Sequence, residues 1–131
     1  PTAGLDPSQR TRFLDVVRSV GTDDTVIFST HIVEDVRELC NDMAIINQGK
    51  ILNHLSPQKA IDDLRGAIWQ TNVSKAGLQT LKKTHKVISE NYGENNDRSV
   101  RVYATDKPSG DFRPAPPTLE DVYFLTQDGS K

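Results

Sequence analysis

The chain has 131 residues, of which 35% are hydrophobic and 26% are charged, and its formal net charge is −2. This composition is typical of one folded domain or two very small ones and excludes an intrinsically disordered chain. The longest apolar runs, such as residues 26–28, are far shorter than the roughly 20 residues of a transmembrane helix, so any membrane association would come through a partner. The weak net charge argues against a dedicated nucleic-acid-binding protein.

In chain order, the first predicted element is a helix that begins at Asp6 and Pro7 and ends at Gly21. An aspartate side chain can cap the free N–H groups of a helix, and proline is favoured at the first helical position. Apolar side chains recur at helical spacing and predict one apolar face. They are Phe13, Val16, Val17 and Val20.

Two short apolar segments, residues 25–29 and 43–46, predict buried strands of the kind found in parallel sheets. After His31, and before the second of these strands, the spacing of apolar residues predicts a second helix. Its apolar side is formed by Ile32, Val36, Leu39 and Cys40. A turn at residues 48–49 is expected to pair residues 50–52 back as a hairpin. The alternation of helices and strands predicts an α/β layer for this half of the chain.

A third short helix is predicted from Ser56 to Leu64, and Gly66 ends it. The pattern of elements changes at this point. We therefore expect two domains, over residues 1–65 and 66–131.

The second half follows the order strand, helix, strand, strand, which predicts a small α+β sandwich. The strands are expected over residues 67–73, 86–92 and 98–104, and Ser74 is expected to cap the helix between the first two. Residues 107–117 contain four prolines and a glycine, a composition that excludes regular structure.

Two landmarks in the first half resemble a known family. A tight turn of small residues leads into the first helix, and it consists of Ala3, Gly4, Leu5 and Asp6. His31 follows the predicted strand at residues 25–29, and Gly49-Lys50-Ile51 comes further on. In this order and at this spacing, these features resemble the D-loop and the H-loop (switch histidine) of ABC-type ATPases. The resemblance covers roughly the first half of the chain.

This resemblance implies that residues 3–6 cross the interface between two ATPase subunits and couple their active sites. It also implies that His31 contacts the γ-phosphate of ATP and helps to hold the attacking water, and that Asp6 belongs to the nucleotide site. By chemistry alone, a histidine after a strand end can donate a hydrogen bond to a phosphate oxygen, but a lone histidine is commonly incidental. Asp6 is expected to cap its helix whichever function holds.

The second half is similar to the C-terminal extension of bacterial ABC ATP-binding subunits of the export type. The similarity rests on Trp69 and on residues 117–123, where Thr118 is predicted to cap a last helix with Asp121 at the capping-box position. In the family, such extensions are thought to regulate or dimerise the ATPase. The expected fold class is therefore α/β, with the C-terminal part of a P-loop ABC ATPase domain followed by a small α+β (β-α-β-β) extension.

The motifs that hold a nucleotide in this family have no counterpart in the sequence. It contains no G-x-x-x-x-G-K-[ST] phosphate loop, no glutamine loop, no Ser-Gly-Gly-Gln signature and no Walker B strand. We therefore expect a C-terminal fragment of the ATP-hydrolysing subunit of an ABC exporter, which by itself binds ATP very weakly and hydrolyses none. ATP and Mg are expected in the full subunit, and no cofactor or metal is expected in this fragment.

The family also implies partners and a location. The expected partners are a second ATP-binding subunit, in a homodimer, and a transmembrane permease; nucleic acid is not an expected partner. The expected location is the cytoplasm, peripheral on the inner face of the cell membrane. One alternative is a stand-alone small-molecule-sensing or regulatory dimerisation module without ATPase activity. Another is a soluble ABC ATPase of translation or DNA repair, which usually carries two cassettes or long coiled-coil insertions. Because the central strands of the first half's sheet would lie upstream, we expect that half to be partly disordered, rearranged or rescued by dimerisation.

Overall fold

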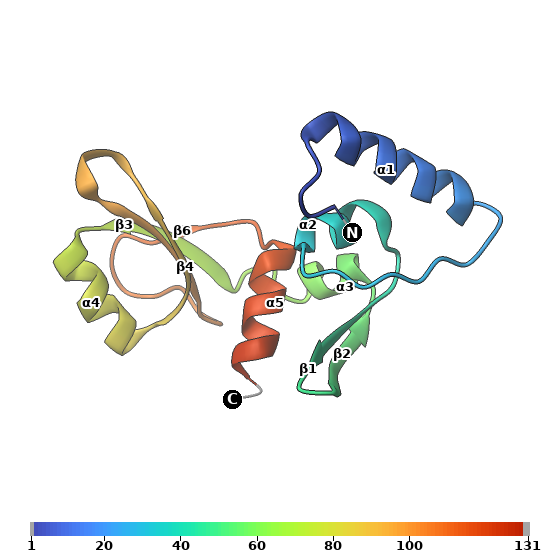
Figure 1. The fold of residues 1–131 in the computed structure, drawn as a ribbon. Coiled ribbons are helices and arrows are strands. Elements are labelled where there is room, and N and C mark those ends of the chain that lie inside the picture. The colour runs from blue at the N-terminus through green and yellow to red at the C-terminus, as the bar shows by residue number, and fades with distance from the viewer. Residues whose placement is uncertain (1, 130–131) are drawn as a thin grey trace. The chain divides into compact units, whose positions relative to one another are not determined.

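A computed structural model describes residues 2–129, and the chain divides into two compact units, Pro1–Lys59 and Ala60–Lys131. Both units mix helices with antiparallel sheets, as Figure 1 shows. Along the chain, the boundary between the units falls within the helix α3 (Pro57–Asp62), whereas the predicted boundary lies in the connection that follows this helix. The assignment of the two halves to an ATPase domain and an extension stays a prediction.

The first unit begins with α1 (Pro7–Gly21), whose predicted start and end are confirmed. The Asp6 carboxylate accepts a hydrogen bond from the Gln9 N–H at 2.8 Å, and the Gln9 side chain accepts from the Asp6 N–H at 3.4 Å. This reciprocal capping box pairs two of the N–H groups that a helix start leaves free.

The predicted apolar face of α1 is partly wrong. Leu14 is the buried residue of this helix, with 4% of its surface exposed, whereas Val16 and Val20 are 57% and 47% exposed. The difference arises because α1 packs against α2 (Val33–Leu39) along a narrow strip. Helical spacing identifies a set of residues on one side of a helix, but the position of the neighbouring element decides which of them become buried.

The segment before α2 differs most from expectation. The strand predicted over residues 25–29 is wrong, because these residues form no strand and Ile27 is 92% exposed. A strand needs a neighbour for its backbone N–H and C=O groups, and the structure pairs no residue in 2–129 with this segment. The predicted helix after His31 is confirmed as α2.

The rest of the first unit is a hairpin of β1 (Met43–Asn47) and β2 (Lys50–Leu55). Its two-residue loop has φ angles of 50° at Gln48 and 73° at Gly49, which match the type I′ turn that suits antiparallel strands. The predicted hairpin is therefore confirmed. The expectation that β1 is a buried strand of a parallel sheet is wrong, because β1 pairs antiparallel with β2 and Ile46 is 60% exposed.

The second unit contains a four-stranded antiparallel sheet in the order β4-β5-β3-β6. The strands run over Ile68–Val73 (β3), Lys86–Tyr92 (β4), Arg98–Tyr103 (β5) and Arg113–Pro114 (β6). Helix α4 (Lys75–Thr84) follows β3, and the Ser74 hydroxyl accepts from the Gly77 N–H at 3.1 Å, as the cap prediction requires. A 3₁₀ turn (Glu94–Asn96) joins β4 to β5.

Helices cover both faces of this sheet. Leu78 of α4 packs with Val100 and Val102 of β5, two side chains that have no exposed surface. Because successive side chains of a strand alternate between faces, Arg101 points to the opposite face. There it pairs with Asp121 of α5 (Leu119–Asp128) at 2.6 Å. The predicted capping box of this last helix is confirmed, with Thr118 and Asp121 bonding to each other's backbone N–H groups.

The proline-rich connection between β5 and α5 is more regular than expected. Residues Arg113–Pro114 form β6, a short edge strand beside β3, so the expectation that no regular element occurs here is wrong. Proline has no N–H to donate, and it is tolerated on an edge strand where that side of the residue faces away from the neighbouring strand. The connection is also attached by the Thr71 hydroxyl, which donates to the Asp111 carbonyl at 2.9 Å, and by the Ala115 N–H, which donates to the Ile68 carbonyl at 3.0 Å.

Candidate functional site

The predicted D-loop residues form an exposed β-turn ahead of α1. The Leu5 N–H donates to the Thr2 carbonyl at 3.2 Å, and Gly4, the third residue of the turn, has a φ of +82°. That conformation is the one a type II turn requires at this position, and glycine adopts it without strain. The surrounding space is open, because an added side-chain carbon at Gly4 would meet no atom within 4 Å. Glycine is therefore needed here for its backbone conformation. Residues 3–6 are all exposed.

Asp6 is the last of the predicted D-loop residues; it follows the turn, and its carboxylate caps α1. Its carboxylate accepts from the Gln9 N–H at 2.8 Å and from the Ser8 hydroxyl at 3.0 Å. These bonds, the Gln9 backbone bond above all, hold the pKa of Asp6 below its ordinary value of 3.8. Asp6 is consequently an anion at neutral pH. An exposed anion favours a cation or an N–H group across an interface over direct contact with a phosphate.

His31 lies in the loop that leads into α2, and its side chain is exposed. The expectation that it follows a sheet strand is wrong, because the residues before it form no strand. Its backbone is nevertheless held on both sides. The Thr30 hydroxyl accepts from the Ile32 N–H at 3.0 Å, and the Ile32 carbonyl accepts from the Asp35 N–H at 3.1 Å. An exposed imidazole on a loop whose backbone is held by hydrogen bonds can donate one hydrogen bond to an anion.

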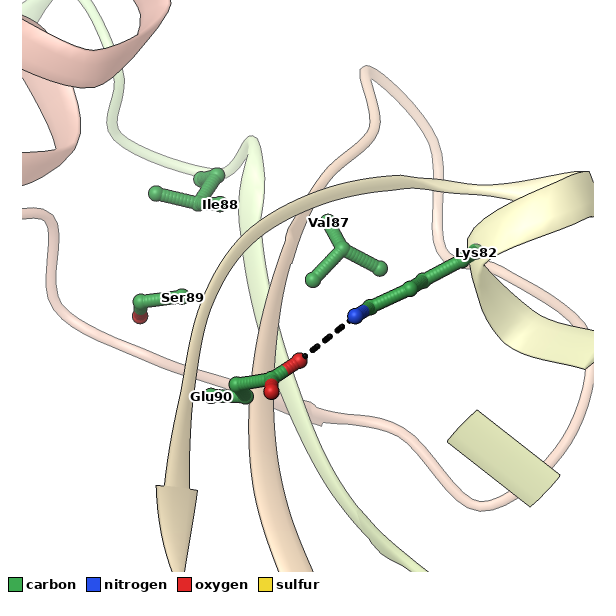
Figure 2. A pocket seen from close by; sticks show the side chains of 5 residues that line it. All are labelled: Lys82, Val87, Ile88, Ser89 and Glu90. Atoms are coloured by element: carbon green, nitrogen blue, oxygen red, sulfur yellow. Dashed lines mark ion pairs between the residues drawn. The ribbon is translucent and has the colours of Figure 1, made fainter. Parts of the chain in front are cut away.

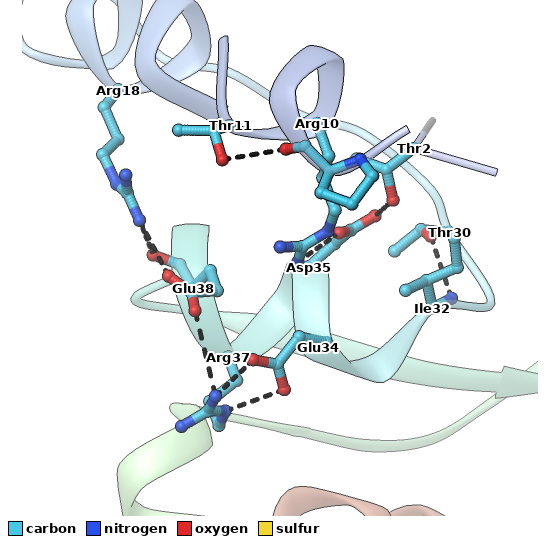
Figure 3. A network of polar contacts seen from close by, with 11 residues as sticks. Thr2, Arg10, Thr11, Arg18, Thr30, Ile32, Glu34, Asp35, Arg37 and Glu38 are labelled. Atoms are coloured by element: carbon cyan, nitrogen blue, oxygen red, sulfur yellow. Dashed lines mark hydrogen bonds and ion pairs between the residues drawn. The ribbon is translucent and has the colours of Figure 1, made fainter. Parts of the chain in front are cut away.

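A buried carboxylate connects the turn, α1 and the helix after His31. Asp35, on α2, has no exposed surface. One of its oxygens accepts from the Thr2 hydroxyl at 2.6 Å, and the other pairs with the Arg10 guanidinium at 3.0 Å, as Figure 3 shows. Asp35 therefore lies between the two segments singled out in the sequence and makes hydrogen bonds on both sides.

Asp35 was not among the predicted site residues, although the sequence pattern contains a signal for it. Asp35 lies three residues after Ile32 and four before Leu39, so helical geometry places it on the predicted apolar side of α2. Charged residues are almost never fully buried unless they are paired. An acidic residue inside an apolar stripe therefore predicts a buried partner, but its spacing cannot identify Thr2 and Arg10.

A second contact between α1 and α2 lies near the surface. Arg18 pairs with Glu38 at 2.9 Å, and 48% of the arginine side chain and 33% of the glutamate side chain remain exposed. Arg37 pairs with Glu34, and this bond lowers the pKa of the Glu34 carboxyl. Ion pairs this exposed typically contribute 0–1 kcal/mol, so we assign them a minor part in holding the site together.

The site residues provide only part of what a nucleotide requires. Nucleotide-binding loops grip phosphates with several backbone N–H groups, and the sequence has no such loop. The exposed imidazole of His31 suits one bond to a phosphate oxygen, and the Asp6 carboxylate does not. Among residues 2–129, no group of three His, Cys, Asp or Glu side chains is placed to hold a metal ion.

The second unit has shallow depressions along β4. One has a volume of about 390 Å³ and is lined by Lys82, Val87, Ile88, Ser89 and Glu90. Figure 2 shows that the ion pair of Lys82 with Glu90, at 3.0 Å, lies across it. The neighbouring Lys86 pairs with Asp128 at 2.9 Å. Lys82 and Lys86 therefore both have acidic partners, which favours a structural role for these lysines over a ligand site.

In the described part of the chain, no helix combines the length and the apolar character needed to cross a lipid bilayer.

Known proteins with similar sequences are ATP-binding transport proteins. The chain is 29% identical over 133 residues to the Nod factor export ATP-binding protein I of Rhizobium meliloti, a match that covers 95% of the chain and 40% of the relative. Over 58 residues it is 38% identical to the cobalt import ATP-binding protein CbiO of Salmonella typhimurium, covering 44% of the chain and 21% of the relative. Over 53 residues it is 40% identical to the linearmycin resistance ATP-binding protein LnrL of Bacillus subtilis, covering 40% and 17%.

No protein-family model matches the chain. The chain spans 40% of the length of the Nod factor export proteins of Rhizobium meliloti that it matches. The similarity to the Nod factor export protein nevertheless covers 95% of the chain, whereas the cobalt import and energy-coupling factor relatives match 44% and 48% of it. These matches identify the chain as a relative of the ATP-binding subunits of ABC transporters.

Proposed function

We propose that this chain is part of an ATP-binding subunit that hydrolyses ATP to power export across a membrane. The observation that carries the proposal is the extent of the similarity to the export relatives. A match over 95% of the chain must include most of the second unit, and the relatives matched to that extent are named for Nod factor export. The relative named for cobalt import matches 44% of the chain, a length that does not require the second unit.

Two segments of the first unit are assigned distinct roles in this proposal. The exposed turn at residues 3–6 contacts a second ATP-binding subunit, where the Asp6 anion accepts hydrogen bonds from its partner. His31 donates a hydrogen bond to the terminal phosphate of ATP and helps to position the attacking water. Mg-ATP supplies the transferred phosphoryl group, and residues outside this chain provide most of the contacts to it.

The second unit is assigned to the C-terminal extension of such a subunit, which regulates or dimerises the ATPase. The complete assembly would pair two ATP-binding subunits with a transmembrane permease, on the inner face of the cell membrane. The names of the relatives as ATP-binding proteins of transport systems support this arrangement.

The proposal is tested by ATP hydrolysis in the whole subunit that contains these residues. His31→Ala is expected to lower kcat by about 10²–10³, the effect of removing one donor from a developing phosphoryl charge. The matched control is His54→Ala, because His54 is also an exposed histidine of the first unit but lies on the β2 hairpin and pairs with Asp42. Equal rates for the two variants would contradict the assigned role of His31.

Calorimetry on the 131-residue chain tests the proposal that residues outside this chain provide most of the contacts to ATP. We expect no measurable heat from ATP at concentrations that saturate the whole subunit, because a single imidazole cannot hold a nucleotide. Specific binding of ATP to this chain alone would contradict the proposed division of the site.

A further inference from the structure

Asp35 is the buried connection between the turn and the loop that contains His31. Its two carboxylate oxygens have separate partners, with the Thr2 hydroxyl at 2.6 Å on one and the Arg10 guanidinium at 3.0 Å on the other. Thr2 is itself 4% exposed, and Asp35 has no exposed surface. Hydrogen bonds with an ionised partner are about twice as strong as neutral ones, so Asp35 holds the start of the chain and α1 firmly to α2.

Hydrogen bonds extend this connection in both directions. On one side, the Asp35 N–H donates to the Ile32 carbonyl at 3.1 Å, and the Ile32 N–H donates to the Thr30 hydroxyl at 3.0 Å, which encloses His31 between two bonded residues. On the other side, the Thr2 carbonyl accepts from the Leu5 N–H at 3.2 Å and closes the turn. Covalent bonds and hydrogen bonds therefore form a continuous path from the turn to the backbone of His31.

The ion pair of Arg18 with Glu38, which also joins α1 to α2, cannot replace this path. Arg18 and Glu38 are both substantially exposed, and their attachment lies at the far end of α1 from the turn. The path through Asp35 is therefore the one that a local change at residues 3–6 would follow.

We propose that Asp35 is a positioning residue, which couples the turn at residues 3–6 to the orientation of His31. The functional meaning of this coupling rests on the proposed function, in which the turn contacts a second ATP-binding subunit and His31 contacts the terminal phosphate. Asp35 has no exposed surface, so it acts through the residues bonded to it. It makes the position of the imidazole depend on the state of the subunit contact, so that hydrolysis responds to dimer formation.

The first experiment measures the coupling in the 131-residue chain and does not require ATPase activity. Thr2→Val removes the hydroxyl but keeps the shape of the side chain, and Thr2→Ser keeps the hydroxyl. We expect Thr2→Val to shift the imidazole resonance of His31 in NMR spectra and to raise the amide exchange rate of Leu5 about tenfold, while Thr2→Ser leaves both close to wild type. The three histidine signals are assigned with single His→Gln variants. An unchanged His31 resonance in a folded Thr2→Val protein would overturn the proposal.

The second experiment uses ATP hydrolysis by the whole subunit. Thr2→Val is expected to lower kcat by about three- to thirtyfold with KM for ATP unchanged, and Thr2→Ser is expected to restore it. A purely structural role would lower the yield of folded protein and leave kcat per folded subunit unchanged, which would overturn the proposal. If Thr2→Val fails to fold, Arg10→Lys, which keeps the charge but changes the geometry of the bond to Asp35, is expected to give the same fall in kcat.

The two experiments separate the proposals. A wild-type subunit without ATPase activity would contradict the proposed function, and the NMR shift would still decide whether Asp35 couples the two segments. A subunit with normal activity in both Thr2 variants would contradict the coupling alone.

Discussion

Replacing Asp35 with alanine should destabilise the first unit strongly. Removing one partner of a buried ion pair usually costs 3–5 kcal/mol, because the other charge is left without compensation. Arg10 is 28% exposed and can regain some hydration, so the cost of its lost partner should fall below that range. The Thr2 hydroxyl, which is 4% exposed, also loses its acceptor, at about 1–3 kcal/mol. Together these effects predict a loss of about 3 kcal/mol in the free energy of unfolding.

Hydrogen exchange measured by mass spectrometry can check this magnitude unit by unit. A loss of about 3 kcal/mol corresponds to roughly 100-fold faster exchange of the protected amides of α1 and α2. The control is Asp15→Ala, because Asp15 is also an acidic residue of the first unit that pairs with an arginine, but its side chain is 68% exposed. Its effect should stay below about 1 kcal/mol. Similar exchange in the two variants would show that burial of Asp35 does not carry the stability assigned to it.

Three further predictions concern the helix caps and the cysteine. Thr118→Ala should lower the stability of the second unit by about 1 kcal/mol, measured by urea unfolding with the fluorescence of Trp69 as the signal. Asp121→Ala should lower that stability further, because it also removes the ion-pair partner of Arg101. Equal losses of stability in the two variants would contradict this prediction. Because backbone and Ser8 hydrogen bonds lower the pKa of Asp6, its cap should stabilise α1 above the unfolded value of 3.8 and be lost as the pH falls through the lower folded pKa. An NMR titration of its carboxyl with a midpoint at or above 3.8 would refute this, and Asp6→Asn should keep the cap in acid. Burial, and secondarily the charge of Asp35, raise the pKa of the Cys40 thiol, so at mildly alkaline pH Ellman's reagent should react with it more slowly than in the urea-unfolded chain.

Helix starts were predictable because the interactions that form them are local. Asp6, Ser74 and Thr118 each accept a hydrogen bond from an N–H three residues later, and residue type and position alone identify such caps. The β1–β2 hairpin was predictable for the same reason, since a two-residue loop ending in Gly49 favours the observed turn.

Strand pairing and burial depend on partners that local patterns cannot specify. Residues 25–29 have the composition of a buried strand, but no described residue pairs with them and Ile27 is exposed to solvent. In the candidate site, the sequence identified Asp6 and His31 as residues of interest. It could not show that Asp35 connects their segments, because Thr2 lies 33 positions away along the chain.

The connection between β5 and α5 suggests where the chain would tolerate an added peptide. The Ala104 carbonyl accepts from the Trp69 indole of β3, the following residues Thr105, Asp106 and Lys107 are exposed, and the next attachment to β3 lies at Asp111. Extra residues inserted after Asp106, such as an epitope or a dye-labelling sequence, should therefore leave the later anchor points in place. The same insertion after Phe112 would fall between this buried residue and the β6 strand that pairs with β3, and should disturb both. A labelled protein for tracking assembly with other subunits could be built on this difference.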